Sequence, residues 1–138
     1  MPNFNSALGR KAKKLLNSET IIWLTTVGSD LTPQPRPVWF VPDGDDVLIY
    51  SQPKAAKLAH IRSHPRVSLH FNADQWGSDG TVVALTGTAT LESATPRGPL
   101  SAAYIKKYKK DMAELDMTPE QFAASYSQPI RVKITGLR

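Results

Sequence analysis

Three side chains that can bind an anion lie close together in the segment SQPKAAK, residues 51–57. Ser51 carries a hydroxyl group, and Lys54 and Lys57 carry ammonium groups three residues apart. Pro53 is typical of the first turn of a helix, so Ser51 is expected at a helix N-terminus, where free backbone N–H groups also attract anions. Together these donors predict a phosphate site. A helix cap beside two solvated lysines explains the same residues equally well.

The sequence contains no other recognisable catalytic or metal-binding pattern. His60 and His64 lie four residues apart, a spacing at which two histidines can share a metal ion, but no third ligand is evident. The glycine-rich dinucleotide motif, the P-loop and the G-x-S-x-G motif are all missing. We therefore expect no metal and assign no catalytic residue. If the protein is an enzyme, a bound cofactor is expected to supply the chemistry.

The segment that carries the anion-binding residues is predicted to join two strands through a short helix. Residues 48–50 are a β-prone run, and residues 54–62 contain good helix formers with one apolar face. His64-Pro65 ends the helix, since the residue before a proline disfavours the helical conformation. Apolar residues then alternate with polar ones over residues 67–71, which predicts a half-buried strand.

A proline-rich strand is predicted at residues 34–41. Prolines 33, 35 and 37 cannot donate to a sheet, so the first half of this strand must lie at an edge or be irregular. An edge strand leaves backbone groups free, and a flat heterocycle could use them as hydrogen-bond partners. Trp39 lies in the second half of the strand, and packing in the core is the commoner fate of such a tryptophan.

The predicted elements together indicate an α+β fold. Strands are expected at residues 21–27, 34–41, 47–50, 67–71, 81–91 and 130–134, and three or four short helices at residues 3–16, 54–62, 101–115 and from Thr118. Thr118, Pro119 and Gln121 have the pattern of a capped helix start, and Gly87 predicts a bulge or a close approach of another backbone. Six strands in this order predict a mainly antiparallel sheet, closed into a barrel, in a single domain over residues 1–138.

The composition is that of a globular protein with an excess of positive charge. Of the 138 residues, 41% are hydrophobic and 21% are charged, and the formal net charge is +5. We therefore expect an anionic ligand; nucleic acid is a weaker alternative, because polar helix faces explain the lysine clusters and no nucleic-acid-binding motif accompanies them. The sequence contains no cysteine, no apolar run of membrane-spanning length and no apparent signal peptide, so a cytoplasmic location is expected.

Several segments resemble one known family. The run LIYSQPKAAKLAHIRSHPRVSLHF, residues 48–71, resembles the cofactor-phosphate segment of the pyridoxamine 5′-phosphate oxidase-like, FMN-binding split-barrel superfamily. Further matching segments are WLTTV, PVWFV, IYSQP and MTPEQFAASYSQPIRV. Within the superfamily the chain is most similar to the actinobacterial branch of F420-dependent oxidoreductases. The resemblance extends over nearly the whole chain from Ile21, and it implies a split β-barrel homodimer with two cofactor sites at the subunit interface.

The resemblance also implies which residues hold the cofactor. The phosphate would be bound by the turn after the third predicted strand, through Ser51, Gln52, Pro53, Lys54 and Lys57. The ring would be lined, mostly through backbone atoms, by Pro37, Val38 and Trp39. Arg36 would reach the phosphate or the ring, and Trp76 and Arg131 would reach toward the site of the second subunit.

The sequence departs from the family pattern beside the phosphate-binding lysine. Ala55 and Ala56 stand where the FMN oxidases have serine and arginine, and the first hairpin has Asp30-Leu31 in place of Asp-Gly. The two alanines favour the deazaflavin F420, whose long anionic tail needs a longer basic track. The expected activity is therefore F420-dependent hydride transfer between the reduced cofactor and an unknown small-molecule acceptor. The alternatives are an FMN-dependent oxidase or reductase and a non-catalytic carrier of F420 or haem.

Overall fold

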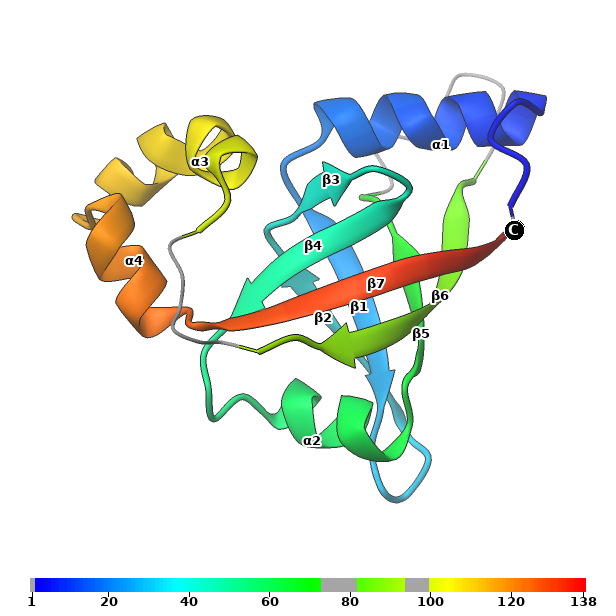
Figure 1. Cartoon of the computed structure of the whole chain (residues 1–138). Helices are drawn as coiled ribbons and strands as arrows, with labels where there is room; N and C mark the ends of the chain where they lie inside the picture. The colour runs from blue at the N-terminus through cyan, green and yellow to red at the C-terminus, as the bar shows by residue number, and fades with distance from the viewer. Residues whose placement is uncertain (1, 73–81, 94–99) are drawn as a thin grey trace.

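The computed structural model describes residues 2–72, 82–93 and 100–138. Seven strands and four helices lie within these ranges (Figure 1). The helices are α1 (Ala7–Ser18), α2 (Ala56–Ser63), α3 (Ala102–Glu114) and α4 (Pro119–Ser125). The strands are β1 (Ile22–Val27), β2 (Pro33–Val38), β3 (Val41–Asp43), β4 (Asp46–Ser51), β5 (Arg66–His70), β6 (Ala84–Leu91) and β7 (Gln128–Leu137). None of the helices in these ranges is both long and apolar enough to cross a membrane.

All seven strands form one antiparallel sheet in the order β2-β1-β5-β6-β7-β4-β3. The sheet curls into a half-barrel, with α1 and α2 at opposite ends and α3 and α4 together on one side (Figure 1). The predicted α+β class and antiparallel sheet are confirmed, but the described strands do not close into a barrel, since β2 and β3 stay at the two edges of the sheet. The prediction of six strands is wrong, because residues 34–41 are not one strand. The chain leaves β1 after Val38 and pairs with β4 from Val41, so the two halves lie at opposite edges of the sheet.

Strand β2 is an edge strand, as its prolines predict. Pro33, Pro35 and Pro37 lie opposite Val27, Thr25 and Trp23 of β1. Because proline has no N–H, the backbone donors that reach β1 must belong to the intervening residues of β2. The prolines therefore present their carbonyl groups to the outer edge, and the guanidinium of Arg36 donates to one of them, the carbonyl of Pro35, at 2.8 Å.

Helix α2 begins later than predicted. Its N-cap is Ala55, which makes no side-chain capping bond, and Pro53 and Lys54 form an exposed turn before it. Ser51 is instead the last residue of β4, opposite Gln128 of β7. The prediction that Ser51 lies at a helix N-terminus is therefore wrong. Pairing with β7 keeps the chain extended through Ser51, so the helix cannot start until the turn has been completed.

Helix α4 begins as its sequence predicts. Thr118 is the N-cap, and its hydroxyl accepts a hydrogen bond from the N–H of Gln121 at 3.1 Å. The side chain of Gln121 accepts one in return from the N–H of Thr118 at 2.8 Å. Pro119 occupies the first turn, where no donor is needed. This capping box fixes the start of α4. The helix carries Phe122, and Tyr126 is its C-terminal cap; both side chains pack with residues of β3 and β4.

The bulge predicted at Gly87 is present. The register between β6 and β7 shifts between Thr86 and Gly87. A Cβ atom at Gly87 would lie 2.7 Å from the carbonyl oxygen of Lys133 and 2.7 Å from a methyl group of Val132. The predicted close approach of another backbone is thus also confirmed, since β7 fills the space that a side chain would need.

Two separate apolar clusters stabilise the fold. The larger one fills the half-barrel and includes Leu24, Ile49 and Leu69. The smaller one joins β3 and β4 to α3 and α4, through residues such as Tyr108 and Phe122. Helices α3 and α4 therefore pack on the barrel through a core of their own, and the candidate site lies where this helical pair meets the sheet.

Candidate functional site

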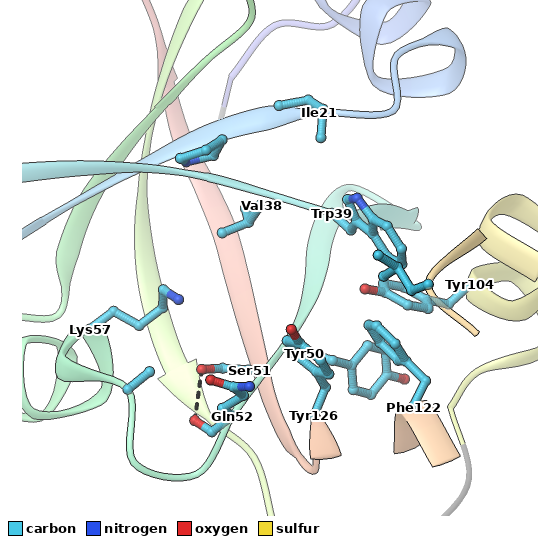
Figure 2. A pocket seen from close by; sticks show the side chains of 13 residues that line it. Ile21, Val38, Trp39, Tyr50, Ser51, Gln52, Lys57, Tyr104, Phe122 and Tyr126 are labelled. Carbon is cyan, nitrogen blue, oxygen red and sulfur yellow. Dashed lines mark hydrogen bonds between the residues drawn. The ribbon is translucent and has the colours of Figure 1, made fainter. Parts of the chain in front are cut away.

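A pocket of about 360 Å³ lies between the half-barrel and the α3–α4 pair (Figure 2). One side is formed by the ends of β2 and β4, the start of α2 and the residue before β1, and the other side by α3, α4 and the residues at their ends. The pocket combines an aromatic wall with a polar end. The residues that line it are Ile21, Pro37, Val38, Trp39, Tyr50, Ser51, Gln52, Ala55, Lys57, Tyr104, Leu115, Phe122 and Tyr126.

The aromatic wall is a column of nearly parallel rings. Trp39 stacks on Tyr108 with ring centroids 4.6 Å apart and on Phe122 with centroids 5.3 Å apart. Phe122 in turn stacks on Tyr126 at 4.3 Å. The angles between successive planes are 3°, 12° and 8°. The wall is thus an apolar, aromatic boundary of the pocket, against which a ligand ring can make aromatic contacts.

The polar end of the pocket carries a cation. The ammonium group of Lys57, from the first turn of α2, points into the pocket (Figure 2), and the side chain is half-buried. Burial and the nearby charge of Arg36 lower the pKa of Lys57. Within the described ranges Lys57 forms no ion pair. A partly desolvated ammonium group without a carboxylate partner favours the binding of an anion.

Ser51 lies beside Lys57 at this end. It is only 2% exposed, and its hydroxyl donates to the backbone carbonyl of Gln52 at 2.9 Å. A hydroxyl oxygen that donates one hydrogen bond can still accept another, or it can turn its proton to a ligand. Ser51, Gln52 and Lys57 thus surround the space that an anionic group would occupy.

The structure brings together six of the predicted site residues and places four elsewhere. Pro37, Val38, Trp39, Ser51, Gln52 and Lys57 line the pocket. Arg36, Pro53 and Lys54 are exposed and do not line it. Arg131 forms ion pairs with Asp43, Asp46 and Glu92, at 2.9, 3.4 and 3.1 Å. Trp76 lies outside the described residues.

Sequence reasoning missed many of the residues that line the pocket. Tyr50, Tyr104, Phe122 and Tyr126 line the pocket, and so does Leu115, which is 54% exposed. The signal for Tyr104 was its place on the apolar face of the predicted helix at residues 101–115. That pattern shows which face of the helix is buried but not which part of the protein it packs against. A role of Tyr104 in binding could therefore not be separated from a role in packing.

Tyr108 does not line the pocket but supports the segments that carry its aromatic wall. Its ring is fully buried, and its hydroxyl oxygen lies 2.6 Å from the carbonyl oxygen of Thr20 and 2.9 Å from both the N–H nitrogen and the carbonyl oxygen of Phe40. The residues that follow Thr20 and precede Phe40 are Ile21 and Trp39, which line the pocket. One hydroxyl from α3 therefore fixes two segments of the pocket wall.

Lys107 is expected to make the stability of the protein rise with pH. Its ammonium group donates to the carbonyl of Phe40 at 2.8 Å, and burial lowers the pKa of Lys107 to about 8 from an ordinary value of 10.5. Between these pH values the unfolded chain keeps the proton that the folded protein has lost, so the free energy of unfolding increases with pH. Urea unfolding of the wild type and Lys107→Met at about pH 8 and about pH 10 measures this effect. The free energy of unfolding of the wild type, relative to that of Lys107→Met, should be larger at the higher pH. The same relative free energy at both pH values would contradict the prediction.

The curled antiparallel sheet defines a half-barrel protein, with a pocket that joins an aromatic wall to a lysine. The model of the pyridoxamine 5′-phosphate oxidase family matches residues 8–135, which is most of the chain. The chain therefore belongs to the pyridoxamine 5′-phosphate oxidase-like split-barrel family. Proteins of this family typically bind a flavin-type cofactor, FMN or F420. The family predicted from the sequence is confirmed, while the F420-dependent branch stays a prediction.

Solved structures share this fold at low sequence identity. A candidate pyridoxamine 5′-phosphate oxidase from Listeria innocua is 19% identical, with a TM-score of 0.66 and 94% of each chain covered. An F420 reductase is 23% identical, with a TM-score of 0.61 over 91% of this chain and 94% of that one. The haem storage protein HutZ from Vibrio cholerae is 12% identical, with a TM-score of 0.64 over 96% and 94%. These likenesses show the fold alone. No curated protein matches the sequence.

Proposed function

We propose that this protein is an F420-dependent oxidoreductase that binds the deazaflavin in the pocket between the half-barrel and the α3–α4 pair. The observation that carries the proposal is the half-buried ammonium group of Lys57, which faces the pocket without a carboxylate partner in the part of the chain that is described. Opposite it stands the stacked wall of Trp39 and Phe122. A flat ring joined to an anionic group matches both ends of such a pocket.

The residues present fit the proposed cofactor. Lys57 and Ser51 would hold its phosphate, and Val38 and Trp39 would lie against its ring. When bound, the deazaflavin supplies hydride transfer at its C5 carbon to an unsaturated or quinone-like acceptor. The protein's part is to bind, to orient the ring along the edge strand β2 and to exclude water with the aromatic wall.

F420 is favoured over FMN by the chemistry around the lysine. Ala55 lines the pocket and adds no side-chain donor, so it leaves fewer polar groups around a compact phosphate than a serine or an arginine in this segment would give. Positive charge instead continues outward from Lys57 to the exposed Arg36. A track of this kind suits a long anionic tail. An F420 reductase is among the proteins with this fold, at 23% identity, which is consistent with the proposal.

We further propose that the protein works as a homodimer with the cofactor sites at the subunit interface. Leu115 at the pocket rim is 54% exposed, and a second copy could cover this apolar side chain. Trp76 and Arg131 stay candidates for contacts with the second subunit's cofactor. The hydride acceptor is a small molecule whose identity the pocket does not specify.

The proposal is tested by titrating the protein with F420 and, separately, with FMN while tryptophan fluorescence is followed. A ring that packs against Trp39 should quench its emission. Trp39→Phe is the matched control: it keeps an aromatic surface but should lose most of the quenching, while the absorbance of the ligand still reports binding. Tight binding of F420 with weak binding of FMN supports the proposal. Preference for FMN would assign the protein to flavin chemistry, and binding of neither would refute the cofactor site.

A further inference from the structure

The hydroxyl group of Tyr104 is buried and has no hydrogen-bond partner among the described residues. Tyr104 is 1% exposed and lines the pocket, and its ring packs against the rings of Tyr50, Tyr108 and Phe122. Its one hydrogen bond is made by the backbone N–H, which donates to Ser101. Figure 2 shows the Tyr104 side chain extending from α3, with its hydroxyl oxygen directed toward the pocket.

The two neighbouring tyrosines show that unpaired hydroxyls are not a general property of this cluster. The hydroxyl of Tyr108 lies within hydrogen-bond distance of Thr20 and Phe40. The hydroxyl of Tyr50 accepts from the N–H of Ser101 at 3.0 Å. A buried hydroxyl left unpaired destabilises a fold, and phenylalanine in place of Tyr104 would preserve the same ring contacts without that cost. No partner among the described residues accounts for the hydroxyl, and its position at the pocket makes a bound ligand the candidate partner.

The surroundings of Tyr104 select the kind of partner. Burial raises the pKa of Tyr104, so the phenol keeps its proton and can donate it in a hydrogen bond. The groups around it are the aromatic side chains of Tyr50, Tyr108 and Phe122, whereas the cation, Lys57, belongs to the polar end of the pocket. A neutral donor in an apolar wall suits an uncharged oxygen rather than a phosphate or carboxylate.

We propose that Tyr104 donates a hydrogen bond to a ring carbonyl oxygen of the flat heterocycle bound in the pocket. This inference rests on the proposed function for the orientation of the ligand, with its ring at the aromatic wall and its phosphate at Lys57. Tyr104 then determines which edge of the ring faces α3, and it discriminates against flat ligands that lack an acceptor at this position.

The test compares Tyr104→Phe with Tyr108→Phe in thermal unfolding and in ligand binding. Tyr104→Phe removes an unpaired hydroxyl, so the melting temperature of the ligand-free protein should equal or exceed that of the wild type. Tyr108→Phe should lower it, because groups of Thr20 and Phe40 lose their partner. A clear loss of stability in Tyr104→Phe, equal to that in Tyr108→Phe, would overturn the inference by showing that the hydroxyl is paired within the fold.

The binding probe is lumichrome, a flat alloxazine that has ring carbonyls but no phosphate. Tyr104→Phe should bind lumichrome about fivefold more weakly than the wild type, the usual effect of one neutral hydrogen bond. Lys110→Ala, on the exposed face of α3 and away from the residues that line the pocket, should bind it normally. Lumichrome binding without F420 or FMN binding would refute the proposed function and leave the inference standing. Equal binding by Tyr104→Phe and the wild type, or no lumichrome binding by either, would overturn the inference.

Discussion

Replacement of Lys57 with alanine is expected to weaken the binding of F420 about 10- to 100-fold, because a hydrogen bond to a charged group is worth about 1.5–3 kcal/mol. The ammonium group is half-buried, points into the pocket and has no carboxylate partner in the described ranges, so its attraction to an anion is only partly screened by water. The same change should not reduce the stability of the ligand-free protein, since no ion pair is lost. Fluorescence titration and thermal unfolding measure the two effects.

Lys110→Ala is the matched control for this prediction. Lys110 lies on the exposed face of α3, away from the residues that line the pocket. Lys110→Ala changes the net charge by the same amount as Lys57→Ala, so any effect of overall charge on an anionic ligand appears in both variants. Similar affinities for F420 in Lys57→Ala and Lys110→Ala would mean that Lys57 does not hold the phosphate.

Replacement of Gly87 with alanine is expected to destabilise the protein by about 1–3 kcal/mol, the range typical of overpacked sites. The new Cβ would lie 2.7 Å from the carbonyl oxygen of Lys133, which belongs to the β7 backbone and cannot move without disturbing the ladder between β6 and β7. The expected result in urea is a lower unfolding midpoint with an unchanged slope.

Gly28→Ala is the appropriate comparison for Gly87→Ala. The atoms closest to a Cβ at Gly28 are the ends of the side chains of Gln34, Asp30 and His60, at 3.1, 3.4 and 3.5 Å. Flexible side chains can move by the small amount required, so this variant should be nearly as stable as the wild type. Equal losses of stability in the two variants would indicate a general cost of replacing glycine and not a close contact between β6 and β7.

The parts of the fold that the sequence predicted well depend on local chemistry. The cap of α4 follows from the short-range preferences of Thr118, Pro119 and Gln121. The edge position of β2 follows from the missing N–H groups of its prolines. Lys57 was also singled out locally, from its place shortly after Ser51 and three residues after Lys54, and it lines the pocket although Ser51 is not at a helix N-terminus. In each case neighbouring residues alone determine the outcome.

The parts that could not be predicted depend on contacts between distant segments. Residues 34–41 look like one strand, yet they divide between two edges, because β3 pairs with β4. Lys54 was expected beside Lys57, but pairing of β4 with β7 delays the start of α2 and leaves Lys54 in an exposed turn. The aromatic wall forms only because α4 packs beside Trp39, and no residue spacing in the sequence predicts this contact.

The edges of the half-barrel also bear on how the protein avoids growing into larger sheets. An incoming strand needs donors as well as acceptors, and the outer edge of β2 has only acceptors, because prolines occupy every position that would donate. The opposite edge, β3, is just three residues long and contains Pro42. Both ends of the sheet are thus poor templates for strand addition. This arrangement is expected to protect the folded protein from amyloid-like aggregation even though the seven strands of the described ranges belong to a single open sheet.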